Sequence, residues 1–224
     1  GSGDARTTWQ QPAGPPSLRV YSVSKRTSIA LGQIPDYPFR GDLAVSVSPD
    51  NRFVAILATE AALAPGATPG SVRMVDSWQV QKRLGIAELN RESSVRWVEL
   101  PQEAKLPLEL FEWSPNGRSV AFRARADAAS PEAHLFRLDL ESERIRSVGN
   151  EPVGATFLSS LYPIATPVRW LDSERLLVTR KSSSEADARE DWFVTGAEQA
   201  SVNITANLTT PATQFVQGPK GNLY

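Results

Sequence analysis

The chain has 224 residues, with 24 lysine and arginine residues against 25 aspartate and glutamate residues, so its net charge is −1. This balance excludes the broad basic surface with which many proteins bind nucleic acids or anionic membranes, and we expect neither partner. The chain contains no cysteine, which excludes disulfides, zinc–thiolate sites and a cysteine nucleophile but does not decide between cytoplasm and periplasm. It also contains no run of 18 apolar residues, so no transmembrane helix is predicted.

Residues 1–40 are predicted to hold a tag remnant, a leader and the first strands. The opening Gly-Ser-Gly is typical of a tag remnant, and the segment 12–16 is rich in proline, as flexible leaders often are. Residues 18–23 and 27–31 follow as two short apolar segments separated by polar residues. We predict that they form a strand pair.

A short pattern then occurs three times, at residues 45–55, 111–122 and 168–178. Its clearest copy, 111–122, reads Phe-Glu-Trp-Ser-Pro-Asn-Gly-Arg-Ser-Val-Ala-Phe. Proline fixes φ at the first central turn position, an aspartate or asparagine side chain bonds the local backbone, and glycine accepts a positive φ. Each copy is therefore predicted to be a β-hairpin.

The spacing of the hairpins indicates a larger repeat. Ser48 and Ser114 are 66 residues apart, and Trp113 and Trp170 are 57 residues apart. This distance suits a four-stranded unit with loops, which is the blade of a β-propeller. Two further strands are predicted after the second hairpin and two after the third, in the ranges 134–140, 144–148, 191–196 and 201–205.

The predicted fold is all-β, a β-propeller of four-stranded antiparallel blades of which three to four are present. The blades are expected at about 41–100, 108–148 and 167–209, with another starting in 213–224, so that 41–224 forms a partial propeller. Because an open ring exposes sheet edges, we expect these blades to belong to a larger ring. Within the first blade, residues 81–90 are expected to hold a helical turn.

The loops of an up-and-down blade divide between its two ends. The turn that joins strands one and two lies at the same end as the turn that joins strands three and four. The long loops, 60–71, 126–133, 149–167 and 182–190, are therefore expected together at the opposite end. Long loops on a rigid scaffold often carry binding sites, although surface insertions that carry no function are the alternative.

Four basic residues, Arg123, Arg125, Arg180 and Lys181, lie at the ends of the predicted second strands, beside these loops. They are predicted to form a basic rim that binds acidic groups through charge-assisted hydrogen bonds. Solvated strand ends are the alternative. Trp113 and Trp170 occupy equivalent positions of the repeat, and we expect them to pack between blades.

The repeat resembles a known family. The Trp-Ser-Pro-Asn-Gly hairpin, the strand Leu-Phe-Arg-Leu-Asp-Leu at 135–140 and the segment Asn-Ile-Thr-Ala-Asn-Leu-Thr at 203–209 are similar to the propeller of prolyl-oligopeptidase-type serine peptidases. Periplasmic TolB-like propellers carry similar repeats. The peptidase resemblance, over 41–224, implies a bacterial protein in which a propeller screens substrates for an α/β-hydrolase domain with a Ser-Asp-His triad. One branch of that family comprises the lasso peptide isopeptidases.

The catalytic residues are expected outside this chain. No Gly-x-Ser-x-Gly nucleophile elbow occurs, and His134, the one histidine, opens an alternating strand where a structural role is expected. No metal or cofactor is expected.

Two hypotheses about the function remain. One is a substrate-gating propeller of a prolyl-oligopeptidase-type peptidase, with peptide substrates, the remainder of the propeller and a hydrolase domain as partners. The other is a non-catalytic TolB-like propeller that binds a protein partner.

Overall fold

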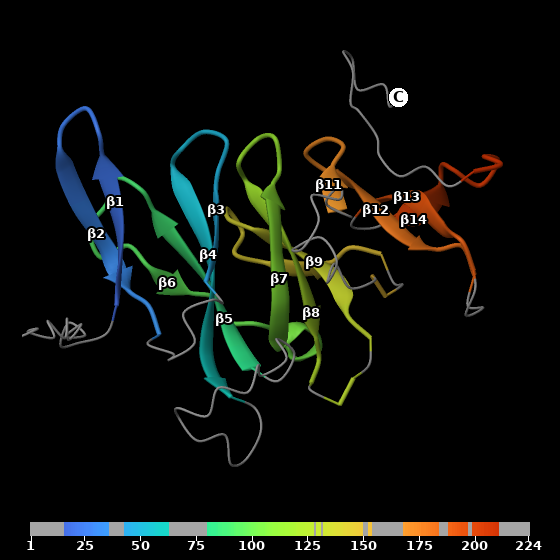
Figure 1. Cartoon of the computed structure of the whole chain (residues 1–224), viewed down its shortest axis with the longest axis horizontal. Coiled ribbons are helices and arrows are strands. Elements are labelled where there is room, and N and C mark those ends of the chain that lie inside the picture. The colour runs from blue at the N-terminus through green and yellow to red at the C-terminus, as the bar shows by residue number, and fades with distance from the viewer. Residues whose placement is uncertain are drawn as a thin grey trace, which may run out of the picture.

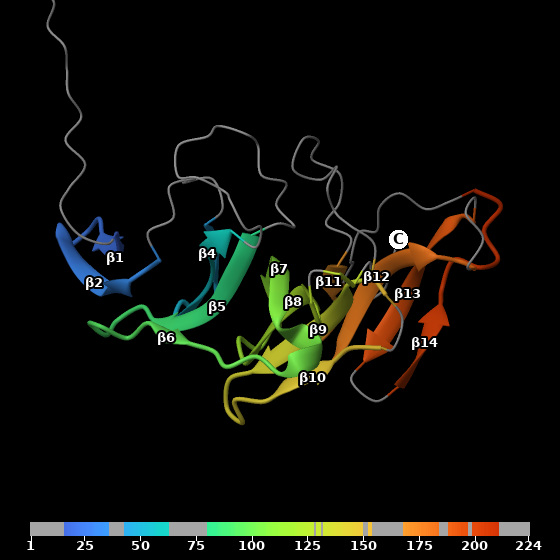
Figure 2. The ribbon, with the colours of Figure 1, turned by 90° about the horizontal axis from the view of Figure 1, so that it is seen from below.

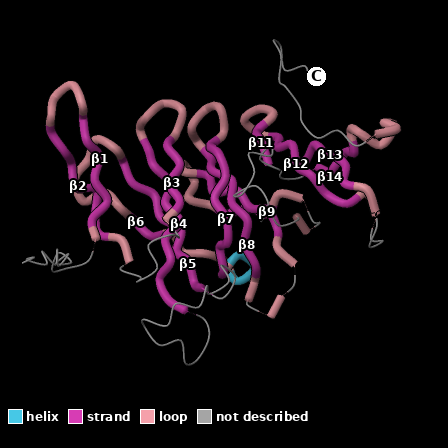
Figure 3. Tube along the Cα trace, in the orientation of Figure 1, coloured by secondary structure: helices cyan, strands magenta, loops and turns pink. Residues whose placement is uncertain are grey.

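A computed structural model describes residues 16–35, 43–62, 80–127, 129–130, 132–149, 152–153, 168–183, 188–196 and 199–210. The strands form one two-stranded sheet and three four-stranded antiparallel sheets that stand side by side (Figures 1 and 3). A single short 3-10 helix, η2 (Gln102–Ala104), occurs among the described residues. No helix there is long and apolar enough to cross a membrane.

Each sheet is built from strands that are consecutive in the chain. The N-terminal hairpin pairs β1 (Ser17–Ser22) with β2 (Thr27–Gln33), which confirms the predicted strand pair. Blade A contains β3 (Ala44–Val47), β4 (Phe53–Ala62), β5 (Val80–Glu88) and β6 (Arg96–Trp97). Blade B contains β7 (Leu106–Trp113), β8 (Ser119–Arg125), β9 (His134–Asp139) and β10 (Ile145–Ser147). Blade C contains β11 (Val168–Trp170), β12 (Arg175–Lys181), β13 (Glu190–Gly196) and β14 (Gln199–Asn203).

The three predicted hairpins are confirmed as β3–β4, β7–β8 and β11–β12. In blades A and B a serine side chain organises the turn: Ser48 Oγ accepts a hydrogen bond from the Phe53 amide, and Ser114 Oγ accepts one from the Ser119 amide, both at 2.9 Å. Gly117 has a φ of 68° in the second of these turns. Glycine adopts this left-handed conformation without the steric cost that a Cβ would bring.

The helical turn predicted at residues 81–90 is wrong, because β5 runs through this segment as a strand paired with β4. The segment contains good helix formers, but its packing is that of a strand: Leu84 and Ile86 both face blade B. Between them, Gly85 lies under Trp97, where a Cβ would stand 2.9 Å from a ring carbon. Tertiary packing therefore overrides local propensity.

The sheets pack face to face through alternating side chains, as β8 shows. Val120 and Phe122 belong to the buried cluster between blades A and B, whereas Ala121 belongs to the cluster between blades B and C. A third buried cluster joins the N-terminal hairpin to blade A through Leu31 and Ile56. Each blade in the middle of the row thus buries both of its faces.

Two tryptophans join the innermost strands of successive blades. Trp113 Nε1 donates a hydrogen bond to the Ser46 carbonyl, and Trp170 Nε1 donates one to the Glu112 carbonyl, both at 2.8 Å. Both rings are buried in the clusters between blades, which confirms their predicted packing role. Strand β7 contacts both β3 and β11, so the first strands of the three blades lie next to one another (Figure 1). The fold is a partial β-propeller.

Candidate functional site

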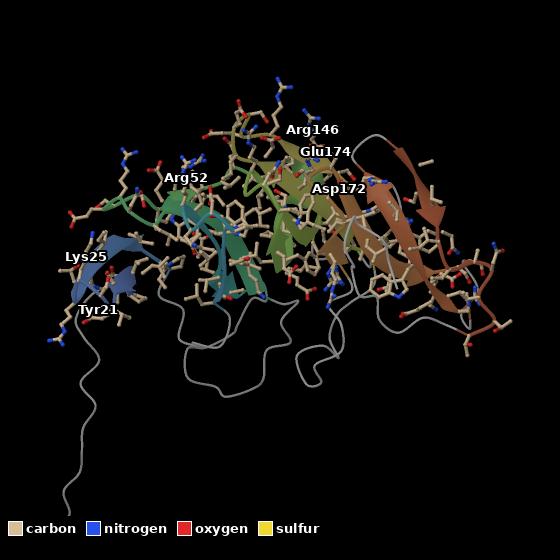
Figure 4. The ribbon with its side chains drawn as sticks, turned by 90° about the horizontal axis from the view of Figure 1, so that it is seen from above. Tyr21, Lys25, Arg52, Arg146, Asp172 and Glu174 are labelled. Atoms are coloured by element: carbon tan, nitrogen blue, oxygen red, sulfur yellow. The ribbon has the colours of Figure 1, made fainter. Side chains whose placement is uncertain are left out.

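The two ends of the propeller differ. The first turns of the three blades, β3–β4, β7–β8 and β11–β12, lie at the top of Figure 1 and face the viewer in Figure 4. The Leu140 amide donates to the Arg118 carbonyl, and the Leu89 amide donates to the Arg52 carbonyl, both at 2.9 Å, so the two short turns touch in blade A and in blade B and share this end, as predicted. We call it the turn end. We call the opposite end, where β4, β8 and β12 finish, the long-loop end. The predicted long loops lie partly outside the described residues, and 213–224 lies wholly outside them.

Arg123, Arg125 and Arg180 point into one space between blades B and C. On β8, Arg123 and Arg125 share the face of Ala121, which packs toward blade C. On β12, Arg180 shares the face of Val178, which packs toward blade B. We call the space that these three arginines enter, at the long-loop end of the apolar cluster, the arginine seam.

Lys181 does not belong to the arginine seam. It is exposed and follows Arg180 directly on β12. Successive side chains of a strand point to opposite faces of the sheet, so Lys181 faces away from blade B. The structure therefore brings three of the four predicted basic residues together and separates the fourth.

Arg123 is held by a carboxylate that the sequence analysis did not single out. Its guanidinium lies 3.3 Å from Glu109 Oε2, and both residues are largely buried. Burial raises the pKa of the Glu109 carboxyl, although the charges of Arg123 and Lys82 act in the opposite direction. Burial likewise lowers the pKa of Arg123, against the charge of Glu109. This ion pair forms one wall of the arginine seam.

Arg180 is held by an aromatic ring. Its guanidinium carbon lies 4.2 Å from the centroid of Phe193, which packs against the apolar cluster between blades B and C. A guanidinium over an aromatic face is attracted by the ring quadrupole, more strongly where water is excluded. Arg180 is itself buried, so the contact fixes a positive charge inside the seam.

Arg125 completes the arginine seam at its outer end. The side chain is partly buried, and its Nε has no hydrogen-bond partner among the residues that the structure describes. Its positive charge helps to lower the pKa of Arg123, a group of the same sign. Two carboxylates beside the seam already form ion pairs, Glu109 with Arg123 and Asp191 with Arg189. The seam region is therefore rich in positive charge, an arrangement that suits an anionic group.

The other end of the same space is closed by an ion pair. Arg137 of β9 is buried and lies 2.8 Å from Glu174, in the β11–β12 turn. A second pair, Arg96 with Glu143, joins blade A to blade B at the same end. An ion pair thus joins blades B and C at the turn end, whereas the three arginines of the seam lie at the long-loop end.

His134 opens β9, where its backbone pairs opposite Ala124. Within the described ranges, no group of three histidine, aspartate or glutamate side chains could hold a metal ion.

The fold and the arginine seam define a partial β-propeller with a basic site between two blades. No family model and no curated protein match the chain. Among solved structures it is similar to TolB from Acinetobacter baumannii, with 11% identity over 84% of this chain and 37% of that chain and a TM-score of 0.45.

It is also similar to two structures of the Pyrococcus horikoshii acylaminoacyl peptidase. The orthorhombic crystal form shows 17% identity over 73% of this chain and 25% of that chain, with a TM-score of 0.42. The uncomplexed enzyme shows 18% identity over 70% of this chain and 23% of that chain, with a TM-score of 0.41. The chain therefore spans 37% or less of the length of each of these three solved chains.

Proposed function

We propose that this chain is the substrate-gating propeller portion of a prolyl-oligopeptidase-type serine peptidase that acts on peptides. The catalytic α/β-hydrolase domain and the remainder of the propeller lie outside this chain. The proposal draws on the resemblance of the hairpin at 111–122, the strand at 135–140 and the segment 203–209 to that family. Lasso peptides are the narrower substrate class that the resemblance suggests.

The observation that carries the proposal is the arginine seam at the long-loop end. Arg123 and Arg180 are held in place by Glu109 and Phe193, so an incoming anion meets guanidinium groups that are already ordered. Arg125 is partly buried beside a group of like charge, and a carboxylate would relieve that repulsion. Carboxylates form bidentate, charge-assisted hydrogen bonds with arginine. An acidic side chain or the C-terminus of a peptide, or an acidic group of the hydrolase domain, has this chemistry.

Binding of an acidic peptide tests the seam. The probe is a fluorescein-labelled peptide of alternating glycine and glutamate, compared with the same peptide carrying glutamine in place of glutamate. We expect Arg125→Gln to weaken binding of the acidic peptide by about tenfold or more, because hydrogen bonds to charged groups contribute about 1.5–3 kcal/mol. Lys181→Gln is the matched control and should leave the affinity nearly unchanged. Fluorescence anisotropy at low salt measures both.

Two results would count against the proposal. Equal losses in the Arg125→Gln and Lys181→Gln variants would indicate a diffuse charge effect and not a site. Equal binding of the acidic and neutral peptides would show that the site has no specificity for anions.

The gene supplies a separate test: a downstream hydrolase with a nucleophile elbow supports the peptidase. A stop codon after further propeller strands would favour a non-catalytic TolB-like propeller that binds a protein partner.

A further inference from the structure

The N-terminal hairpin occupies the position of a blade that precedes blade A. Leu31 of β2 is buried against Val54 and Ile56 of β4. Backbone bonds add to this contact: the Val95 amide donates to the Leu31 carbonyl at 2.9 Å, and the Ser93 amide donates to the Ala30 carbonyl at 3.0 Å. The hairpin therefore packs on blade A face to face, as blades A and B pack on each other.

The two strands of this hairpin correspond to the third and fourth strands of a blade. From β2 the chain passes to β3, the first strand of blade A, just as it passes from β6 to β7, the first strand of blade B. Strand β2 also lies on the same side of the row of sheets as β6 (Figure 2).

The first and second strands of that blade are not found among the described residues. The part of blade A on which the first of them would pack is exposed. Leu43, Val45 and Val47 are 42%, 52% and 48% exposed. Val45 and Val47 pair across the sheet with Ile56 and Val54, which pack toward the N-terminal hairpin. The three apolar side chains, which we call the β3 stripe, therefore face the space beside that hairpin.

The equivalent positions of the other blades are covered. Val47 directly precedes the turn serine of blade A, as Trp113 does in blade B. Trp113 and its counterpart in blade C, Trp170, are only 5% and 7% exposed. Their indoles reach the first strand of the preceding blade. The β3 stripe is exposed because the described residues place no first strand in front of it.

We propose that the β3 stripe and the unpaired edge of β1 bind a β-hairpin that supplies the first and second strands of this blade. The occupant belongs to the remainder of the same propeller. Its inner strand carries apolar residues at alternate positions, which cover the β3 stripe. Its outer strand bonds to β1, which has a strand on one side only within the described residues. The inference rests on the propeller fold and not on the peptidase role.

A grafted hairpin tests this surface. Residues 106–133 contain β7, β8 and the loop that leads from the second to the third strand of blade B. A copy of this segment placed directly before Pro16, in place of residues 1–15, would supply the missing strands in the order of a complete blade. Because the chain has no cysteine, Val47→Cys provides a unique probe of the β3 stripe, and Ser142→Cys in an exposed turn of blade B provides the matched control.

We expect the graft to slow maleimide labelling of Val47→Cys by at least about tenfold, since labelling must then wait for local opening. Labelling of Ser142→Cys should not change. In blade B, Phe111 packs against Val168 and Trp170, which occupy in blade C the positions of Val45 and Val47 in blade A. A graft whose Phe111 counterpart is replaced by serine should therefore give much less protection. The assay contains no peptide ligand, so its result is independent of the acidic-peptide experiment.

Three outcomes would overturn the inference. Equal labelling of Val47→Cys with and without the graft, in chains that unfold cooperatively, would show that the surface takes no hairpin. Protection by the serine graft equal to that by the native graft would show that apolar complementarity is not the cause. Slow labelling of the ungrafted chain that depends on protein concentration would assign the surface to a second copy of this chain.

Discussion

Trp170→Ala is expected to lower the free energy of unfolding by about 3–5 kcal/mol, the range measured for the loss of a large buried aromatic side chain. The ring is buried between blades B and C, so its removal leaves a cavity across the interface. The Glu112 carbonyl also loses the partly buried hydrogen bond that it accepts from the indole N–H, and this loss adds to the cost. Urea-induced unfolding, followed by circular dichroism, measures the change.

The control variants separate the two causes of this loss. Trp170→Phe keeps much of the volume but removes the indole donor, so its loss of stability should be smaller. Trp113→Ala makes the same change at the equivalent position between blades A and B and should cost a similar amount. Tyr21→Ala removes a ring that is exposed, and its effect should stay within about 0.5 kcal/mol. Unchanged unfolding of both tryptophan-to-alanine variants would mean that the blades do not pack through these rings.

Asp191→Ala should also destabilise the fold strongly, by about 3–5 kcal/mol, as expected when one partner of a buried ion pair is removed. Asp191 is 1% exposed. Its carboxylate accepts hydrogen bonds from Asn203 Nδ2 at 2.8 Å and Thr205 Oγ1 at 3.0 Å, and lies 2.9 Å from Arg189 Nε. The alanine variant leaves all three donors without this acceptor. Urea unfolding at neutral pH measures the difference.

The same carboxylate predicts how stability depends on pH. Burial alone would raise the pKa of Asp191, but hydrogen bonds from Asn203, Arg189 and Thr205, with the charge of Arg189, outweigh burial and hold the pKa below its usual value. A lowered folded-state pKa stabilises the fold above the unfolded pKa of about 3.9, and this contribution is lost as pH falls through the folded value. The stability difference between the native chain and Asp191→Asn, which cannot titrate, should therefore shrink below about pH 4. A difference that stays constant down to pH 3 would contradict this assignment.

The sequence predicted the hairpins because their causes are local. A serine, a proline and an asparagine with glycine determine the turn at 114–117, whatever packs on it later. Strand β5 could not be predicted in this way, because its composition favours a helix. Its strand conformation depends on Trp97 over Gly85 and on blade B beside Leu84. Those partners are distant in the sequence.

The same limit applies to the residues of the arginine seam, whose positions on strands can be read locally but whose partners cannot. Basic residues at strand ends could be read from the sequence, and strict alternation along β12 would already have separated Lys181 from Arg180. Glu109 could not be found by counting outward from the β7–β8 turn, because the register shifts between Leu110 and Trp113. Phe193 reaches Arg180 only through the pairing of β12 with β13. Both partners follow from the assembled sheets.

The direction of the tryptophan contacts has a consequence for biosynthesis. The acceptor of Trp113 lies 67 residues earlier in the chain, and the acceptor of Trp170 lies 58 residues earlier. Because the chain is synthesised from its N-terminus, the carbonyl that each tryptophan binds has already been made when that tryptophan leaves the ribosome. N-terminal parts of a protein can also fold first during synthesis. Each new blade therefore meets a finished surface on its predecessor, and the propeller can grow in one direction, one blade at a time.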